Sequence, residues 1–319
     1  RRHYGWAWYQ RKVTLPAFCA GQRVVLRFGS VTHTAKVWLN GKLIAQHKGG
    51  FTPFEADVTA LLHPGETALL TLACDNRVNH STLPVGNEDG QLAFFGSDNA
   101  GIPSVEAAKR AAAPQNRPNF DFFNYAGIHR PVVLYTTPKE YIEDVTVVPA
   151  VDGTVQYAVK TTGSAPVRVT VLDADGNAVA SAEGAAGTLI IPEVHLWEPR
   201  PGTPYLYTLH ITCGADVYDQ TFGVRSIEVR GTQVLLNGKP LYFKGFCKHE
   251  DFTAHGRGFD PVLNVKDVNL IHWANANAVR TSHYPYAEEF YDLCDREGIL
   301  VMDLSLIHIS EPTRHAQIS

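Results

Sequence analysis

The fold of this chain is decided by residues 278–303, AVRTSHYPYAEEFYDLCDREGILVMD. The stretch opens with a short strand, predicted over 278–283, in which apolar residues give way to polar ones. A helix is predicted over 285–297, because proline stands near its first turn, two glutamates follow in that turn, and Gly298 comes directly after the last turn. A further apolar strand is predicted over 299–303. This order of elements favours a parallel α/β sheet.

The residues before this stretch repeat the same order. An Asn237-Gly238 turn leads into a strand that we place near 242–246. A helix is predicted over 264–275, with Asn264 as its N-cap and Asp267 at the third helical position. We therefore expect three strands to pair in parallel under two helices, as at the start of a barrel.

The first 138 residues read as strands and turns. Apolar residues alternate over 24–28, and Asn40-Gly41 between two apolar runs is a strong hairpin signal. Because no long helical period is present, a β-sandwich is predicted. Trp6, Trp8 and Trp38 could stack on sugars, but we expect them to pack in the core. The later segment 79–119 is rich in Gly, Pro, Asn and Ser, and a connection of that length is often functional.

A second β region runs from about residue 141 to 230. Apolar residues alternate over 167–171 and again over 205–211, and Asp175-Gly176 supplies a turn between strands. Short strands at this spacing are typical of an immunoglobulin-like sandwich. The sequence as a whole therefore predicts a mostly β protein that ends in an α/β unit.

Composition excludes several classes of function. The 319 residues carry a net charge of −4, with 45% apolar and 19% charged residues, so the chain can bury a core. The chain has no excess of basic residues, so neither nucleic acid nor an acidic membrane surface is an expected partner. The five cysteines lie far apart and are odd in number, which favours reduced thiols in a bacterial cytoplasm over a disulfide framework. The first residue is arginine rather than methionine, so we expect the natural N-terminus to lie upstream.

Several motifs together resemble the glycoside hydrolases of family 2. Residues 277–285, NAVRTSHYP, resemble a signature of that family, and LWEP at 196–199 with FGVR at 222–225 resemble the end of its immunoglobulin-like domain and the entry to its barrel. The stretches DFFNYAGIHR at 121–130 and GFCKHED at 245–251 resemble its β-glucuronidase branch more narrowly. The resemblance extends over residues 1–303.

This resemblance implies a definite domain order. We expect a jelly-roll sugar-binding domain over 1–138, an immunoglobulin-like β-sandwich over 139–232, and the first part of a (β/α)8 TIM barrel over 233–303. Residues 304–319 break the pattern of the barrel, and we expect them to be a non-native tail.

The resemblance also implies site residues. His283 follows a predicted barrel strand, and active sites of such barrels lie at the carboxyl ends of the strands. In the family, the histidine that matches His283 contacts substrate, and the aspartate that matches Asp121 reaches from the jelly roll to the sugar hydroxyls. Arg280 is expected to support the catalytic end of the barrel without touching substrate. Packing or salt-bridge roles are the alternatives for each.

The implied reaction is retaining hydrolysis of β-D-glucuronides to glucuronate and an aglycone, which uses two glutamates and no cofactor or metal. Both glutamates belong to later barrel strands, so we expect this chain to lack them and to be inactive. Small-molecule glucuronide conjugates are the expected partners, and the resemblance implies a homotetramer for the full-length enzyme. A β-galactosidase-like exo-glycosidase and a non-catalytic carbohydrate-binding β-sandwich remain alternatives.

One further cluster suggests a metal only superficially. His249, Glu250 and Asp251 stand near His255, but the spacing lacks the His-Glu-x-x-His pattern of a zinc helix. We expect a solvated or hydrogen-bonded loop there.

Overall fold

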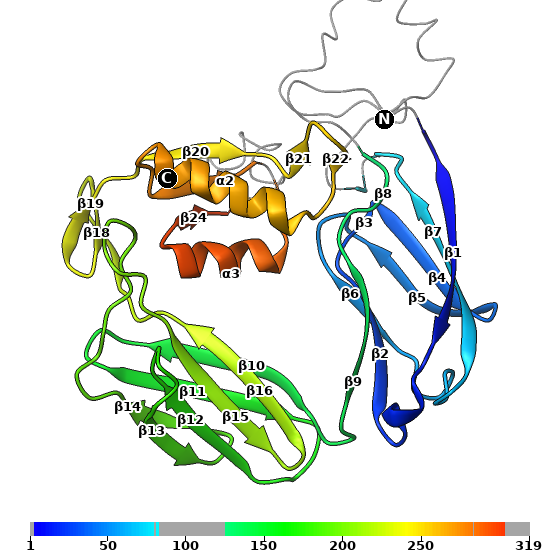
Figure 1. Ribbon diagram of the computed structural model, residues 1–319, viewed down its shortest axis with the longest axis horizontal. Coiled ribbons are helices and arrows are strands. Elements are labelled where there is room, and N and C mark those ends of the chain that lie inside the picture. The colour runs from blue at the N-terminus through cyan, green and yellow to red at the C-terminus, as the bar shows by residue number, and fades with distance from the viewer. Residues whose placement is uncertain (1–2, 80, 83–124, 283, 304–319) are drawn as a thin grey trace, which may run out of the picture.

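The computed structural model describes residues 3–79, 81–82, 125–282 and 284–303. Three units follow one another along the chain (Figure 1). Two are antiparallel β-sandwiches, and the third is a small parallel sheet with two helices. The fold is mostly β, as the sequence predicts.

The first sandwich is built from two antiparallel sheets with a shared apolar core. Phe28, Val37 and Leu39 are almost completely buried between the sheets. The predicted Asn40-Gly41 hairpin is confirmed, since both residues adopt positive φ. In order of pairing, one sheet holds β1 (Trp6–Thr14), β7 (Thr67–Asp75), β4 (Thr34–Leu39) and β5 (Lys42–Lys48), and the other holds β6 (Phe54–Asp57), β2 (Arg23–Phe28) and β9 (Val132–Thr137). The 3-10 turn η1 (Ala17–Cys19) and the short pair β3 (Val31–Thr32) and β8 (Gly127–Ile128) complete the unit.

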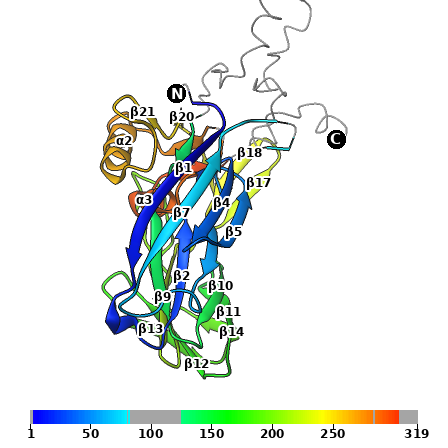
Figure 2. The same cartoon turned by 90° about the vertical axis from the view of Figure 1, so that its right-hand side faces the viewer.

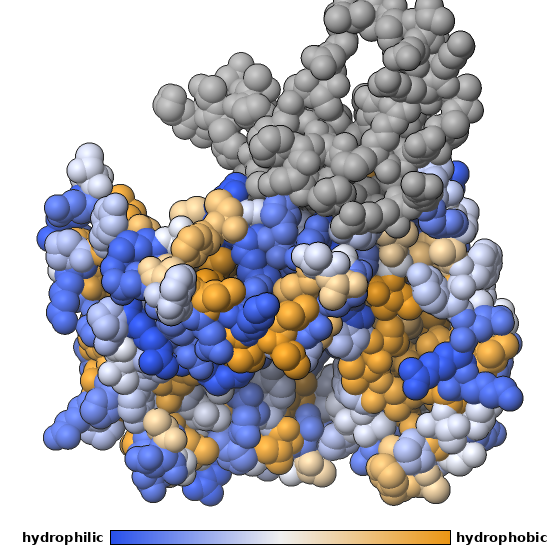
Figure 3. Space-filling model, turned by 45° about the horizontal axis from the view of Figure 1, so that its top comes forward, coloured by the Kyte–Doolittle hydropathy of each residue, from blue (hydrophilic) through white to orange (hydrophobic). Residues whose placement is uncertain are grey.

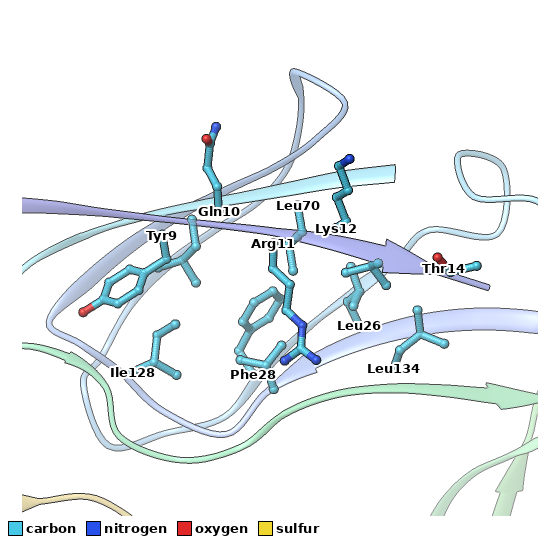
Figure 4. Close-up of a pocket in the computed structure, with 13 residues that line it drawn as sticks. Tyr9, Gln10, Arg11, Lys12, Thr14, Leu26, Phe28, Leu70, Ile128 and Leu134 are labelled. Carbon is cyan, nitrogen blue, oxygen red and sulfur yellow. The ribbon is translucent and has the colours of Figure 1, made fainter. Parts of the chain in front are cut away.

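This sandwich is open along one side. Strands β1 and β9 are edge strands of the two sheets in the described part of the chain, and a hollow of about 520 Å³ lies between them. Tyr9 and Arg11 point into the hollow, Tyr9 on the side of Ile128 and Arg11 beside Phe28, whereas Gln10 and Lys12 point away from it (Figure 4). The alternation along β1 therefore separates an inner from an outer face.

The second sandwich is closed around its own residues. Val169, Val171, Leu209 and Ile211 are fully buried between its sheets. The sheets are β10 (Ile142–Pro149), β11 (Thr154–Thr161) and β14 (Ala186–Ile190), and β13 (Ala178–Glu183), β12 (Val167–Leu172), β15 (Tyr207–Cys213) and β16 (Asp216–Phe222), in order of pairing. The alternating patterns in the sequence predicted this unit correctly.

A small antiparallel sheet leads into the parallel unit. It consists of β17 (Ile227–Arg230), β18 (Gln233–Leu236) and β19 (Lys239–Leu241). The parallel sheet then has the order β20 (Gly245–Lys248), β23 (Ala278–Thr281) and β24 (Leu300–Met302), and β21 (Asp251–Phe252) pairs with β22 (Gly256–Arg257) beside it. The parallel pairing confirms the prediction, although the first strand begins later than the predicted 242–246.

Helices α2 (Pro261–Trp273) and α3 (Glu288–Glu297) cover one face of this sheet. The predicted start of the first helix was wrong: Asp260 is the N-cap and accepts hydrogen bonds from the backbone N–H groups of Val262 and Leu263, each at 3.0 Å. Proline at the next position suits the first turn, and Asn264 lies buried inside the helix.

The second helix starts later than predicted but ends where expected. The N-cap of α3, Ala287, is extended, so the predicted first turn from residue 285 is not helical. Gly298 adopts a left-handed conformation with φ of 71°, the usual way to end a helix.

The three tryptophans of the first sandwich are not core residues, contrary to the prediction. Trp8 is 64% exposed and Trp6 is 36% exposed, because β1 turns its even-numbered side chains outward. The outer face of this sheet turns toward the viewer in Figure 2.

Candidate active site

The carboxyl ends of the three parallel strands bring polar side chains together. Lys248 pairs in register with Thr281, and Ser282 and Asp303 directly follow β23 and β24. In barrels of this kind the reacting groups lie at this end of the strands. This edge is therefore the candidate site.

Asp303 is held in place by two hydroxyl donors. Thr281 Oγ1 donates to Asp303 Oδ1 at 2.6 Å, and the Tyr291 hydroxyl of α3 donates to the same oxygen at 2.9 Å. Burial and the neighbouring Asp303 carboxylate raise the pKa of Tyr291, so the phenol keeps its proton. The carboxylate is thus fixed between the second and third strands.

Arg280 lies on the face of the parallel sheet opposite the helices, because the preceding residue, Val279, packs under α2 and α3. It shares this face with Cys247 and Met302, its partners in register on the two neighbouring strands. Its guanidinium Nη1 is 3.7 Å from Cys247 Sγ and 3.4 Å from Ser282 Oγ. The strand alternation thus turns Arg280 away from the helices, and its supporting role stays a prediction.

Two predicted site residues, Asp121 and His283, lie outside the described residues. The neighbours of His283 are described: Ser282 and Tyr284 are 1% and 0% exposed. The loop after β23 is therefore anchored on both sides of His283.

A buried ion pair, absent from the sequence predictions, joins the first sandwich to the candidate site. Arg130 Nη2 lies 3.1 Å from Glu250 Oε2, and both side chains are 6% exposed. Arg130 also donates to the backbone oxygens of Phe51, at 2.9 Å, and of Pro285. Glu250 Oε1 accepts from the Ala287 N–H at 3.1 Å. One arginine thus ties the loops after β20 and β23 to the sandwich.

Of the two predicted states of the loop at 249–251, Glu250 is hydrogen-bonded and is not exposed to solvent. The Glu250 N–H donates to the Tyr284 hydroxyl at 3.0 Å, and the side chain is buried. Among the residues that the structure describes, no group of three His, Cys, Asp or Glu side chains could hold a metal ion.

Aromatic rings and a second arginine complete this junction. The guanidinium of Arg257 lies 4.5 Å from the centroid of the Tyr284 ring and 3.2 Å from Asp251. Phe51 of the first sandwich stacks on Tyr284 with ring centroids 4.4 Å apart. Burial, followed by the positive charge of Arg257, holds the pKa of the adjoining His129 well below its usual 6.5. These contacts join residues far apart in sequence, so one sequence carries no local signal for them.

A crevice of about 240 Å³ opens at the same boundary. It is lined by Phe51 and Arg130 from the sandwich and by Pro285, Tyr286 and Asp303 from the parallel unit. The larger hollow of the first sandwich lies elsewhere, between its two sheets. Figure 3 shows apolar and polar residues interspersed over the face of the molecule that is turned toward the viewer.

No helix in the described ranges is long and apolar enough to cross a membrane.

Comparison with models of protein families defines the class of protein to which this chain belongs. Three models match consecutive parts of the chain: glycosyl hydrolases family 2 sugar binding domain over residues 1–138, glycosyl hydrolases family 2 over 140–225, and glycosyl hydrolases family 2 TIM barrel domain over 227–309. The two sandwiches and the parallel sheet occupy these ranges in the same order. The class is that of the glycosyl hydrolases, and the chain belongs to family 2.

Several relatives of this chain are β-glucuronidases. The β-glucuronidase of Canis lupus familiaris is 44% identical, matching 96% of this chain and 48% of its own length, and that of Paenibacillus borealis is 43% identical over 95% and 50%. Among solved structures, a Faecalibacterium prausnitzii β-glucuronidase is 96% identical with a TM-score of 0.90, covering 96% of this chain and 51% of that one. A Bifidobacterium dentium β-glucuronidase complexed with coumarin-3-O-glucuronide is 50% identical with a TM-score of 0.87, covering 96% and 53%. The resemblance seen in the sequence is confirmed, and the chain spans about half the length of the curated relatives it matches.

Proposed function

We propose that this sequence is part of a retaining β-glucuronidase, which hydrolyses β-D-glucuronides to glucuronate and an aglycone. The observation that carries the proposal is the 96% identity to the Faecalibacterium prausnitzii enzyme over 96% of this chain. The order of the three units and the polar strand ends of the parallel sheet support it. The substrates are small-molecule glucuronide conjugates, and the homotetramer that the resemblance implies belongs to the same proposal.

The proposal includes the inactivity of the 319 residues by themselves. Retaining hydrolysis needs one carboxyl group as nucleophile and a second as acid and base, about 5–5.5 Å apart. The carboxylates at the described strand ends are already engaged: Glu250 with Arg130, Asp251 with Arg257, and Asp303 with Thr281 and Tyr291. We therefore place both catalytic glutamates outside this sequence.

The residues of this chain would bind and orient the sugar. Asp121 would accept hydrogen bonds from sugar hydroxyls, and His283 would donate to the sugar from the loop after β23. Arg280 would hold the inner face of the sheet in place through Ser282 without contacting substrate. The reaction needs no cofactor.

Two measurements test this function. The purified chain should release no product from a chromogenic β-glucuronide above the level of a denatured sample, whereas the longer enzyme should turn it over. Within the longer enzyme, Asp121→Ala should lower kcat/KM with little change in Tm, and Asp175→Ala, at an exposed turn, should change neither. Turnover by the 319-residue chain would disprove the placement of the glutamates. Equal turnover of a β-galactoside by the longer enzyme would favour the alternative exo-glycosidase.

A further inference from the structure

The outer face of the sheet β1-β7-β4-β5 carries a cluster of three indole rings, of which Trp6 and Trp8 are exposed and Trp38 is half-buried. Trp8 of β1 stacks on Trp38 of β4, with ring centroids 5.5 Å apart and planes 21° from parallel. Trp6 lies two residues before Trp8 on the same face, and Lys36 Nζ is 5.6 Å from the centroid of its ring. We call Trp6, Trp8 and Trp38 the indole platform.

A small residue of the central strand β7 lies beside this platform. Ala73 of β7 pairs in register with Trp8 on one side and Lys36 on the other, so its side chain points to the same outer face. Ala73 is nevertheless only 1% exposed, which requires neighbouring side chains to cover it. A methyl group at this position lets large rings lie across the sheet.

Large aromatic rings exposed to solvent call for an explanation, because apolar groups gathered on a surface commonly mark a binding site. The face of an indole ring is electron-rich and attracts positively polarised hydrogens and cations. The C–H face of a pyranose ring presents such hydrogens on a flat, weakly apolar surface. The indole platform therefore suits a sugar ring better than a flexible aliphatic chain.

The polar groups around the platform indicate the kind of sugar. Lys12 and Lys36 lie on the same outer face, and Gln10 donates to Thr71 there at 3.1 Å. Among the described residues of these four strands, the outward carboxylate is Asp75, which is 8% exposed and bonded to Arg77 at 2.5–2.9 Å. The unneutralised charge of the face is thus positive and complements an anionic ligand.

We propose that this face binds acidic, uronate-containing saccharides. The indole platform stacks on a sugar ring, and Lys36 and Lys12 attract the uronate carboxylate. The inference goes beyond the proposed hydrolysis and does not depend on it, since a chain that cannot cleave a glycosidic bond can still bind a saccharide on this face.

Calorimetric titration of the full chain tests the proposal. The probes are an oligosaccharide of alternating glucuronate and N-acetylglucosamine and a neutral β-linked glucose oligosaccharide of equal length. The acidic probe should bind saturably and more tightly than the neutral one, and added salt should weaken the acidic probe alone. Trp8→Ala should weaken binding of both probes by about tenfold. Lys36→Gln should reduce the preference for the acidic probe, and Lys36→Gln with Lys12→Gln should remove it.

Matched variants separate binding from folding. Trp273→Ala removes a tryptophan that is 86% exposed on α2, far along the chain from the platform, and should leave both affinities unchanged. Trp8→Phe keeps an aromatic ring and should recover most of the affinity lost in Trp8→Ala, with unchanged circular dichroism in both. Absence of saturable binding, or binding that Trp8→Ala leaves intact, would overturn the proposal. Equal affinity of the original chain for the two probes would overturn the role of the lysines.

Discussion

The second sandwich and the parallel unit obtain their cores in different ways. The core of the second sandwich is formed by residues between Val155 and Val224, all from that unit. The core under the parallel sheet includes Phe51 and Val78 of the first sandwich beside its own Val268, Ile271 and Phe290. One unit is therefore self-contained, and the other is completed by its neighbour.

The second sandwich also contacts the parallel unit, through residues outside its own core. Trp197 packs on Ala278 and Leu300 of the parallel sheet, and its indole N–H donates to the backbone oxygen of Asp295 at 2.8 Å. Arg200 N–H donates to the Gly298 oxygen at 3.1 Å, beside the end of α3. The three parallel strands of this chain are therefore stabilised by contacts with both sandwiches.

The largest loss of stability is expected when the positive charge of Arg130 is removed. Arg130→Met should cost about 3–5 kcal/mol of unfolding free energy, because it leaves Glu250 buried without its partner. Hydrogen exchange should show that β23 and α3 lose protection while β12 and β15 of the second sandwich keep theirs. The double variant Arg130→Met, Glu250→Gln should regain part of the loss.

An exposed ion pair provides the control for Arg130. Arg230 pairs with Glu228 at 3.0 Å with both side chains largely exposed, so Arg230→Met should cost only about 0–1 kcal/mol. If the two arginine variants lose equal stability, or if β12 and β15 lose as much protection as β23, the parallel unit does not depend on the buried pair.

A smaller effect is expected from pH at His129. Burial keeps this histidine neutral in the folded chain, with a pKa well below 6.5, whereas the unfolded chain takes up a proton near that value. The unfolded state then binds more protons, so stability is lost as the pH falls below 6.5. Between pH 7 and 5 protonation of the unfolded chain alone limits the loss from this group to about 2 kcal/mol.

Urea unfolding at several pH values measures this loss. His129→Gln should reduce the loss of unfolding free energy between pH 7 and 5, while His63→Gln, at an exposed position, should leave that loss unchanged. A His129→Gln variant that keeps the full slope would show that other groups cause the acid sensitivity.

The smallest test compares two buried isoleucines. Ile211→Val in the second sandwich and Ile271→Val under the parallel sheet should each cost about 0.5–1.5 kcal/mol. Exchange data should confine the first effect to the second sandwich, whereas the second should spread to the strands around Phe51. An effect of Ile271→Val that stops within α2 and α3 would mean that the shared core does not link the two units.

The sequence predicted local features well. Asn40-Gly41 and Gly298 each require positive φ, a property of the residue type itself, so their turns were found correctly. The parallel order followed from alternating strands and helices. The start of α2 was misplaced because Asn264 and Asp260 are both good caps, and the choice depends on which residues the sheet buries.

Features that depend on distant partners were not predictable. Arg130 and Glu250 are 120 residues apart, and nothing in either segment identifies the other. The exposure of Trp8 was missed because composition favours burial of tryptophan, whereas the register of β1 decides the direction of its side chain. The positions of Asp121 and His283 stay predictions.

The shared core also sets an order of events during synthesis. Phe51 and Trp197 leave the ribosome long before Val279 and Leu300, and domains generally fold as units in that order. The two sandwiches then present finished surfaces to the emerging parallel strands. Assembly on a surface that already exists spares these strands much of the loop-closure entropy that distant contacts cost in an unfolded chain. The first two units therefore act as an intramolecular template for the third.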